Sequence, residues 1–319
     1  MIRALVATLL AAATVAAHAQ PYPQRPVRMI VPFASGGLTD GLARLVAVYL
    51  GEQLKQSVVV ENRPGGGGTI GTEVAARATS DGYNILLGSL EGYGMTYADA
   101  RRLNYDPEKD LAPIAMVARA PNLVIVHPSV KAGTMMELIE LARANPGKIR
   151  YGSPGIGGNA HIIGERLKQR FGIDLVHVPY KGGGSGINDL ISGQIEMMLT
   201  GVVTATGHVR AGKARGLALT GNSRAPSLPE VPTVAEAGIS DFALGPILGI
   251  WAPAGTPPLA IARLTQEVLA VKQNPEFRKR IADIGQQPSE DLVGAEFGRY
   301  MVAEAQRWRE MAATAGLKD

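Results

Sequence analysis

Short apolar runs alternate, in the first third of the chain, with longer segments in which apolar residues recur at helical spacing. The runs cover residues 27–33, 57–62 and 84–88, the length of buried strands. After the first run, apolar residues recur three or four positions apart at Leu42, Leu45, Val46, Tyr49, Leu50 and Leu54. We predict that Thr39 caps this helix, with Asp40 in its first turn, and that a second helix starts at Thr69. This βαβαβ order predicts parallel strands covered by helices.

The same alternation returns in the middle of the chain. Strands are predicted at residues 122–128, 148–153, 174–180, 195–199 and 214–220. Thr134 and Glu137 form a capping box, which predicts a helix that ends at residues 145–147. Three more helices are predicted after Asn159, after Ser185 and at residues 205–211. This part of the chain is therefore a second α/β unit.

The last part of the chain supplies one strand and three helices. The strand covers residues 247–253, and the helices cover residues 257–271, 275–284 and 293–315. Because these helices have no strands of their own, we expect them to cover the first sheet. We predict a two-domain α/β fold like that of the periplasmic binding proteins, with each sheet mainly parallel and two crossover strands between the domains. Its parts are residues 22–121 with 254–319, residues 129–245, and the crossovers 122–128 and 246–253.

The first 19 residues have the three parts of an export signal. Arg3 gives a basic start, residues 4–16 are apolar, and Ala17-His18-Ala19 is an A-x-A cleavage site. The alternative is a membrane anchor, but the apolar run is shorter than the roughly 20 residues that a span needs. We therefore predict cleavage after Ala19 and a periplasmic protein.

Composition excludes several classes of site. The chain has no cysteine, and hence neither disulfides nor thiolate ligands. The formal net charge of +4 is not gathered into a basic patch, and only five Phe and two Trp are present, so we expect no nucleic acid partner. The histidines show no metal-ligand spacing, and we predict neither a metal nor a cofactor.

Glycine-rich segments lie where predicted strands lead into helices. Glycine lets backbone N–H groups approach a bound group, and a helix N-terminus adds partial positive charge. Two of these segments, residues 33–40 and 153–161, contain no Lys or Arg, so they predict an anion held by main-chain donors. The alternatives are tight turns that bind nothing and, for the histidine, a buried ring with satisfied nitrogens. The candidates are Phe33, Ala34, Ser35, Gly36, Gly37, Thr39, Asp40, Ser153, Gly155, Gly157, Gly158 and His161.

Further candidates follow other strands. Open α/β sheets bind ligands outside the carboxyl ends of their strands. Tyr180 and Lys181 follow one predicted strand, Thr200 and Gly201 another, and Ser89 a third. For Lys181 the alternative is a solvated side chain on a loop.

Two glycine patterns and the catalytic motifs offer other functions. G-x-G-x-x-G at Gly66 and G-x-G-x-x-A at Gly155 match dinucleotide fingerprints, but Asp174 begins the next strand where an acid should end it. We therefore interpret both as glycine turns. The chain has no G-x-S-x-G, H-E-x-x-H or P-loop sequence, which disfavours a hydrolase. A ligand sensor for a membrane signalling partner stays open.

Several longer segments occur together in one order: YPQRPVRMIVPFASGGLTD, VVVENRPGGGGTIGTEVAARATSDGYNILLGS, VHVPYKGGGSGINDLISGQIEMM and WAPAGTPP. The chain therefore resembles the tripartite tricarboxylate transporter receptors, the TctC or Bug family of periplasmic solute-binding proteins, over nearly its whole mature length. The resemblance implies a non-enzymatic, monomeric receptor whose two domains close on a small di- or tricarboxylate or aromatic acid. It also implies delivery of that ligand to the permease subunits of a membrane transporter.

The sequence departs from the family pattern at three places near the expected ligand. Leu38 stands where glycine is common, the stretch after Ser89 is rearranged, and Thr200-Gly201 replaces a frequent Asp-Asn. These departures bear on the identity of the ligand rather than on the fold.

Overall fold

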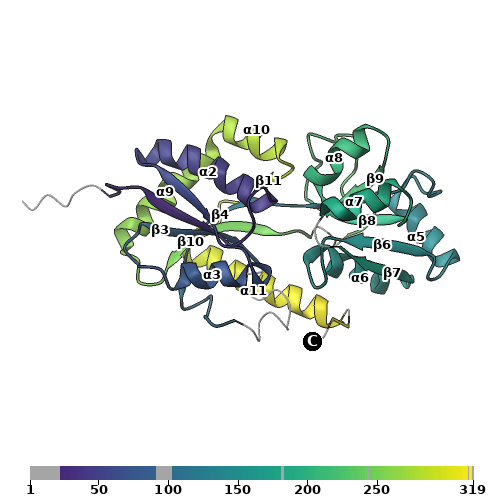
Figure 1. Cartoon of the computed structure of the whole chain (residues 1–319), viewed down its shortest axis with the longest axis horizontal. Coiled ribbons are helices and arrows are strands. Elements are labelled where there is room, and N and C mark those ends of the chain that lie inside the picture. The colour runs from purple at the N-terminus through teal and green to yellow at the C-terminus, as the bar shows by residue number, and fades with distance from the viewer. Residues whose placement is uncertain are drawn as a thin grey trace, which may run out of the picture.

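The protein consists of two β-sheets side by side, each covered by helices on both faces (Figure 1). This computed structural model describes residues 22–90, 103–180, 183–240, 242, 244–314 and 316–317. The arrangement confirms the predicted two-domain α/β fold. The predicted export signal, Lys181 and the stretch after Leu90 lie outside the described residues.

The first sheet has the strand order β11-β4-β10-β3-β1-β2. Its strands are β1 (Val27–Val31), β2 (Val58–Asn62), β3 (Asn84–Ser89), β4 (Leu111–Arg119), β10 (Ile247–Pro253) and β11 (Gln287–Pro288). One face is covered by α2 (Leu38–Leu54), α9 (Pro258–Gln273) and α10 (Pro275–Asp283). The other face is covered by α3 (Thr69–Ala76), which follows a 3-10 turn η1 (Gly66–Gly68), and α11 (Gly294–Thr314). The C-terminal helices thus cover the first sheet, as expected.

The side-chain alternation of the strands explains why both faces need helices. On β1, Val27, Met29 and Val31 pack toward α2, α9 and α10, whereas Ile30 belongs to the core on the opposite face. Successive residues of a strand point to opposite sides, so an uninterrupted apolar run buries both faces.

The second sheet has the strand order β7-β6-β8-β5-β9. Its strands are β5 (Asn122–Val126), β6 (Ile149–Ser153), β7 (Leu175–Pro179), β8 (Met197–Gly201) and β9 (Arg215–Leu219). One face packs against α5 (Met135–Ala144) and α6 (Asn159–Phe171), and the other against α7 (Gly183–Ile191) and α8 (Val202–Arg210). The predicted cap at the start of α5 is confirmed for Thr134, whose Oγ1 accepts from the Glu137 N–H at 3.2 Å, while the Glu137 carboxylate accepts from the Gly133 N–H at 2.6 Å, one residue before the cap.

The sheets are mixed, which corrects the expectation that each is mainly parallel. β1 pairs in parallel with β2 and β3, and β6 with β7 and β8. β10 is antiparallel to β3 and β4, and β5 is antiparallel to β8 and β9. The reason is the path of the chain: β4 leads toward the second sheet and β10 returns from it, so these neighbours run in opposite directions.

The chain passes between the sheets in short segments. The expected crossovers coincide with β5 and β10, but β5 pairs only within the second sheet and β10 only within the first. The passages therefore lie before these strands, and the Ala120 N–H donates to Pro246 O at 2.9 Å where the two passages meet. Because this junction is narrow, we propose the division into residues 22–121 with 254–319 and residues 129–245, with a hinge at the junction.

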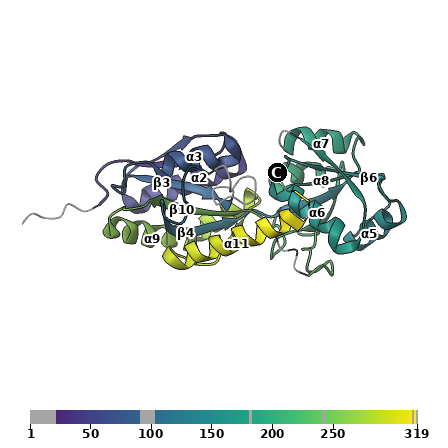
Figure 2. The same ribbon diagram turned by 90° about the horizontal axis from the view of Figure 1, so that it is seen from below.

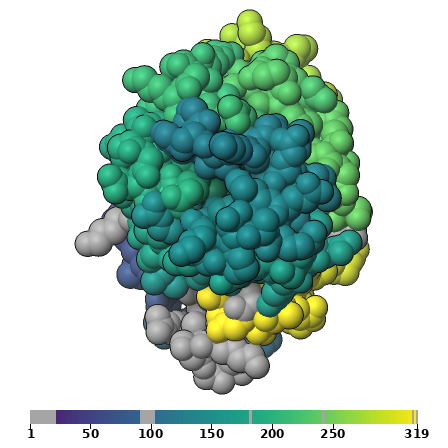
Figure 3. All heavy atoms as spheres, turned by 90° about the vertical axis from the view of Figure 1, so that its right-hand side faces the viewer, coloured from purple at the N-terminus to yellow at the C-terminus, as the bar shows by residue number. Residues whose placement is uncertain are grey.

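Helix α11 forms a further link between the two units. It runs beneath the first sheet and reaches α6 (Figure 2), and in Figure 3 its yellow atoms lie along the lower edge of the second unit. The Gln169 side-chain amide donates to the carbonyl of Thr314, the last residue of α11. The C-terminal helix thus contacts both units.

Candidate functional site

Three helices begin with a glycine at the junction between the two sheets. The N-cap residues of α2, α6 and α8 are Gly37, Gly158 and Gly201, all with extended backbone. A helix leaves its first N–H groups without intrahelical partners, and glycine has no side chain with which to bond them. The three helix ends therefore present backbone donors and partial positive charge.

The three helix ends line one cavity of about 450 Å3 between the sheets. Its lining residues are Phe33, Leu38, Thr39, Gly67, Ser89, Ala120, Asn122, Pro154, Gly155, Gly158, Asn159, Ala160, Gly201, Pro246 and Leu248. They come from both units and from the junction. A ligand in this cavity would contact both sides at once.

The cavity gathers a part of the residues expected from the sequence. Six of them line it: Phe33, Thr39, Ser89, Gly155, Gly158 and Gly201. Ten others do not line it: Ala34, Ser35, Gly36, Gly37, Asp40, Ser153, Gly157, His161, Tyr180 and Thr200. Nine lining residues were not among the candidates, although the sequence placed the first of them near the expected ligand: Leu38, Gly67, Ala120, Asn122, Pro154, Asn159, Ala160, Pro246 and Leu248. The signal for Leu38 and Asn159 was available, since each directly follows a glycine N-cap.

Asp40 organises the loop that precedes α2. Its buried carboxylate accepts from the Gly36 N–H at 2.8 Å, Arg44 Nε at 2.9 Å and Asn62 Nδ2 at 2.9 Å. Burial favours the protonated form, but the bonds from Arg44, Gly36 and Asn62 prevail and hold the pKa of this carboxyl below its usual range. Asp40 therefore fixes the conformation of this loop without itself lining the cavity.

These bonds correct two details of the expected loop. We expected the N–H groups of residues 33–37 to face the cleft, but that of Gly36 is committed to Asp40. We also expected Thr39 to cap the helix. The cap is Gly37 and Thr39 is the second residue of α2, because the extended backbone of Gly37 lets the helix begin earlier.

A pair of stacked histidines, neither of which lines the cavity, supports the glycine-rich loop at residues 153–158. The His161 ring stacks on the His177 ring with centroids 3.7 Å apart, and His161 Nδ1 accepts from the Gly157 N–H at 3.0 Å. His177 Nε2 lies 2.8 Å from Ser153 Oγ, which also donates to Gly155 O at 2.9 Å. His161 thus matches the alternative of a buried ring with a satisfied nitrogen.

Burial keeps both rings neutral. It lowers the pKa of His161, and together with the neighbouring His161 ring it lowers the pKa of His177 to about 4. Glu165 Oε1, 3.9 Å from His161 Nε2, acts in the opposite direction but is outweighed. At neutral pH, His161 Nδ1 can therefore accept the bond that holds the loop.

Two asparagines join the junction to α6. Asn122 Nδ2 donates to Asn159 Oδ1 at 2.7 Å, and both residues line the cavity. The Asn122 backbone makes two hydrogen bonds with Thr220. The Asn122 N–H donates to Thr220 Oγ1 at 2.9 Å, and the Asn122 carbonyl accepts from the Thr220 N–H at 2.8 Å. Asn122 therefore ties the first turn of α6 to the passage between the sheets.

Leu38 closes one side of the cavity. A Cβ built on Gly201 would lie 3.7 Å from Leu38 Cδ1, so the side chain lies directly against the start of α8. The Leu38 carbonyl accepts from Gln286 Nε2 at 3.0 Å, and Gln286 is itself buried. The first residue of α2 is thus held against the other unit.

Tyr180 and Thr200 are not among the residues that line the cavity. The Tyr180 hydroxyl donates to Asp189 Oδ2 at 2.8 Å, while burial, and next this bond, raises its pKa to about 12. Thr200 is fully buried beneath the start of α7, where a Cβ on Gly183 would come within 2.9 Å of its hydroxyl. Both side chains therefore contact α7, and neither residue lines the cavity.

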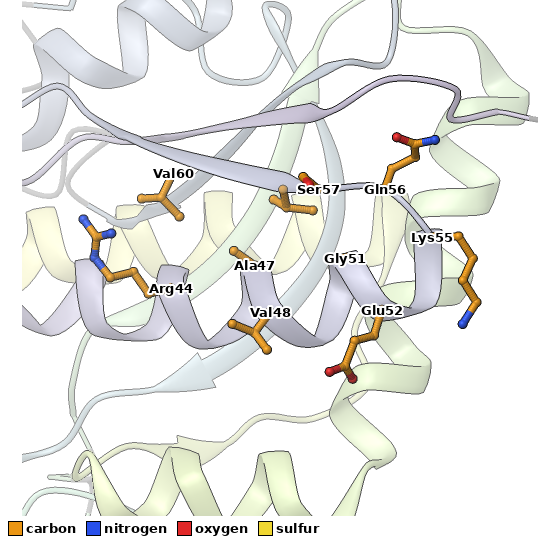
Figure 4. Close-up of a pocket in the computed structure, with 10 residues that line it drawn as sticks. Arg44, Ala47, Val48, Gly51, Glu52, Lys55, Gln56, Ser57 and Val60 are labelled. Carbon is orange, nitrogen blue, oxygen red and sulfur yellow. The ribbon is translucent and has the colours of Figure 1, made fainter.

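A larger hollow, of about 680 Å3, lies on the outside of the first unit between α2 and β2 (Figure 4). It is bordered by Gly51, Glu52 and Lys55 at the C-terminal end of α2. The partial charge of a helix C-terminus is negative, and Arg44 already bonds Asp40. This hollow is therefore less suited to an anion than the cavity between the sheets.

Neither a metal site nor a membrane-spanning helix occurs among the described residues. Within residues 22–90, 103–180, 183–240, 242, 244–314 and 316–317, no group of three His, Cys, Asp or Glu side chains could hold a metal ion. No helix in this part of the chain is long and apolar enough to span a membrane.

The sequence matches the family model described as the tripartite tricarboxylate transporter family receptor over residues 42–317. It is 33% identical to the protein BugT of Bordetella pertussis over 320 residues, which covers 99% of this chain and 97% of BugT.

Three solved structures share the fold at moderate identity. The periplasmic binding protein BugD is 34% identical, with a TM-score of 0.76, and the match covers 93% of this chain and 99% of BugD. Rpa4515 of Rhodopseudomonas palustris, with adipate, is 33% identical with a TM-score of 0.78, covering 92% and 98%. MatC of the same organism, with bound malate, is 29% identical with a TM-score of 0.75, covering 91% and 99%. Two carboxylates thus occur among these structures.

Proposed function

Because the chain belongs to the tripartite tricarboxylate transporter receptor family, we propose that it captures a small carboxylate between its two domains and delivers it to a tripartite tricarboxylate-type membrane transporter. The family consists of periplasmic solute-binding receptors and is not an enzyme family. We propose that this chain likewise has no catalytic activity. We also propose that it is exported with cleavage after Ala19 and acts as a monomer.

One observation carries the proposal: three glycine-capped helix N-termini line a single cavity. A carboxylate there would accept N–H bonds from α2 on one domain and from α6 or α8 on the other. Such charge-assisted bonds contribute roughly 1.5–3 kcal/mol each. The adipate and malate of two similar structures support a carboxylate as the ligand.

The same geometry supports closure of the domains around the ligand. A ligand shifts a conformational equilibrium only by contacts that differ between the two states. The helix ends belong to opposite domains, so a carboxylate that bonds both makes more contacts in the closed state. We therefore propose that binding closes the hinge at the junction of Ala120 and Pro246.

A proline substitution can remove one backbone donor without a change of charge. Asn159 is the first residue of α6, where proline is tolerated, and Gly158 before it has φ −72 and ψ 166, as a residue preceding proline requires. Asn159→Pro lacks the N–H, whereas Asn159→Ala keeps it, and both lose the bond to Asn122 equally. Their difference in affinity therefore reports the N–H alone.

The test is calorimetry with adipate and malate as probes. We expect saturable binding to the wild type, and an affinity for Asn159→Pro roughly 10- to 100-fold below that of Asn159→Ala. Equal affinities of the two variants would show that this helix end does not hold the ligand. If Lys181→Ala alone abolished binding, an ion pair would replace the main-chain donors in the proposal.

A further inference from the structure

A short segment of the first domain contacts the second domain outside the cavity. Residues 285–287, the contact segment, connect α10 to β11, and β11 pairs with β4 at the edge of the first sheet. In Figure 1 the end of α10 lies on the side of the first unit that faces α8. The residues of the contact segment do not line the cavity. Its contacts with the second domain are therefore separate from those that a ligand would make.

Gly285 brings the backbone of the contact segment against the first turn of α8. A Cβ built on Gly285 would lie 2.9 Å from Val202 Cβ, closer than a real Cβ approaches another carbon, and 3.1 Å from the Val203 backbone nitrogen. Its φ of +69° is also one that favours glycine. Since Gly201, the N-cap of α8, lines the cavity, the contact segment packs against one of the three helix ends of the site.

Gln287 makes a second contact across the domains. Its side-chain amide donates to the carbonyl of Ser223, in the segment that follows β9. The amide nitrogen lies 2.6 Å from the position of a Cβ built on Gly221, so the amide occupies the space that a side chain at position 221 would need. Gln287 is buried, and a buried amide that loses its partner is costly. The amide therefore fits the second domain in one place.

Gln286 connects the contact segment to the cavity wall. Its Nε2 donates to the carbonyl of Leu38 at 3.0 Å, and Leu38 is both the first residue of α2 and a lining residue. Gln286 itself is buried. The contact segment, the start of α2 and the start of α8 are thus packed together in the arrangement that forms the cavity.

From these contacts we infer that Gln287 is a positioning residue for ligand binding, which holds the two domains in the arrangement that forms the cavity. The inference rests on the proposed function and adds to it a residue that the ligand does not touch. The apparent affinity of a receptor is its intrinsic affinity multiplied by the fraction of molecules in the binding-competent arrangement. The bond from Gln287 to Ser223 exists only while the domains are in contact, so it raises this fraction.

Calorimetry with adipate and malate as probes tests the role of Gln287. Gln287→Ala removes the amide, and the affinity should fall about three- to tenfold. A residue with a merely structural role would lower the unfolding temperature and leave the affinity unchanged. Gln306→Ala is the matched control, because Gln306 bonds Glu310 within α11 at 2.8 Å, and it should keep the wild-type affinity. Unchanged affinity in Gln287→Ala would overturn the inference.

A substitution on the other domain tests the same contact. In Gly221→Ala the new methyl group takes the place of the Gln287 amide, so the bond to Ser223 is lost and the affinity should again fall about three- to tenfold. With Gln287→Ala the methyl group has room, and the double variant should bind about as tightly as Gln287→Ala alone. Additive losses would mean that the two residues do not meet in the binding-competent state, which contradicts the inference.

Small-angle scattering of the ligand-free protein separates the inference from the proposed function. Gln287→Ala and Gly221→Ala should both have a larger radius of gyration than the wild type, whereas Gln306→Ala should not. Equal radii in all four proteins would overturn the inference. If no acid bound to the wild type, the proposed function would fail, and the scattering comparison would still decide whether Gln287 holds the domains together.

Discussion

Leu38 and Gly201 are paired across the two domains: the leucine side chain fills space that a side chain larger than alanine at position 201 would need. The built Cβ of Gly201 lies 3.7 Å from Leu38 Cδ1, an ordinary contact, and Gly201 has φ −63, which every residue can adopt. An alanine therefore fits at this position, but a larger side chain overlaps with Leu38.

This pairing predicts a coupled effect of two substitutions. Gly201→Ile should hold the domains apart and lower the affinity for the carboxylate by at least about tenfold, whereas in a Leu38→Ala background the same change should cost less than threefold. A calorimetric double-mutant cycle measures the coupling. Additive effects would mean that the two residues do not meet in the ligand-bound state.

We expect Asp40 to stabilise the loop mainly through its bonds from Gly36 and Asn62, and less through its ion pair with Arg44. Asp40→Ala leaves the Gly36 N–H and the Asn62 amide without this acceptor, which should cost roughly 2–4 kcal/mol of unfolding free energy. Arg44→Ala should cost less, about 1 kcal/mol, because Arg44 is 55% exposed and the buried Asp40 carboxylate keeps its bonds from Gly36 and Asn62. Urea unfolding of both variants gives the comparison. Similar losses for the two would place the stabilisation in the ion pair.

The elements that sequence reasoning predicted are those with local signals. The apolar runs of β1, β2 and β3 and the Thr134 cap of α5 depend on residues close in the chain, and the structure contains them. β4 was missed because Pro113 lies within it, and proline normally argues against a strand in the interior of a sheet. There it pairs with Trp251, from a segment far along the chain.

The same limit applies to the candidate site: residues with a local signal could be predicted from the sequence, and residues brought in by a distant segment could not. The glycine-rich segment before a helix indicated Gly158, and the end of the predicted strand at residues 195–199 indicated Gly201; both residues line the cavity. Ala120, Pro246 and Leu248 carry no local signal, because only the return of the chain as β10 brings residues 246–248 beside residues 118–120. Local patterns also do not show that a backbone donor is already used, as the N–H of Gly36 is by Asp40.

The last prediction concerns the stacked histidine pair that supports the glycine-rich loop at residues 153–158. The pKa of His177 in the folded protein is about 4, and burial also lowers that of His161. In the unfolded chain an ordinary histidine has a pKa of about 6.5. Between these values the unfolded chain binds protons that the folded protein does not, so stability is complete above about pH 6.5 and is lost as the pH falls toward 4.

Thermal unfolding at pH 7.5, 6 and 5 measures this loss. The unfolding temperature should fall by a few degrees between pH 7.5 and 5, and His177→Gln, which cannot titrate, should show a smaller decrease. His208→Gln removes a histidine outside the pair and serves as the control, with the wild-type decrease expected. No measurement goes below pH 5, because carboxyls with lowered pKa, such as Glu61 at about 2, also contribute there. The same decrease in His177→Gln and in the wild type would mean that other groups cause it, and that the pair is not what makes the fold sensitive to acid.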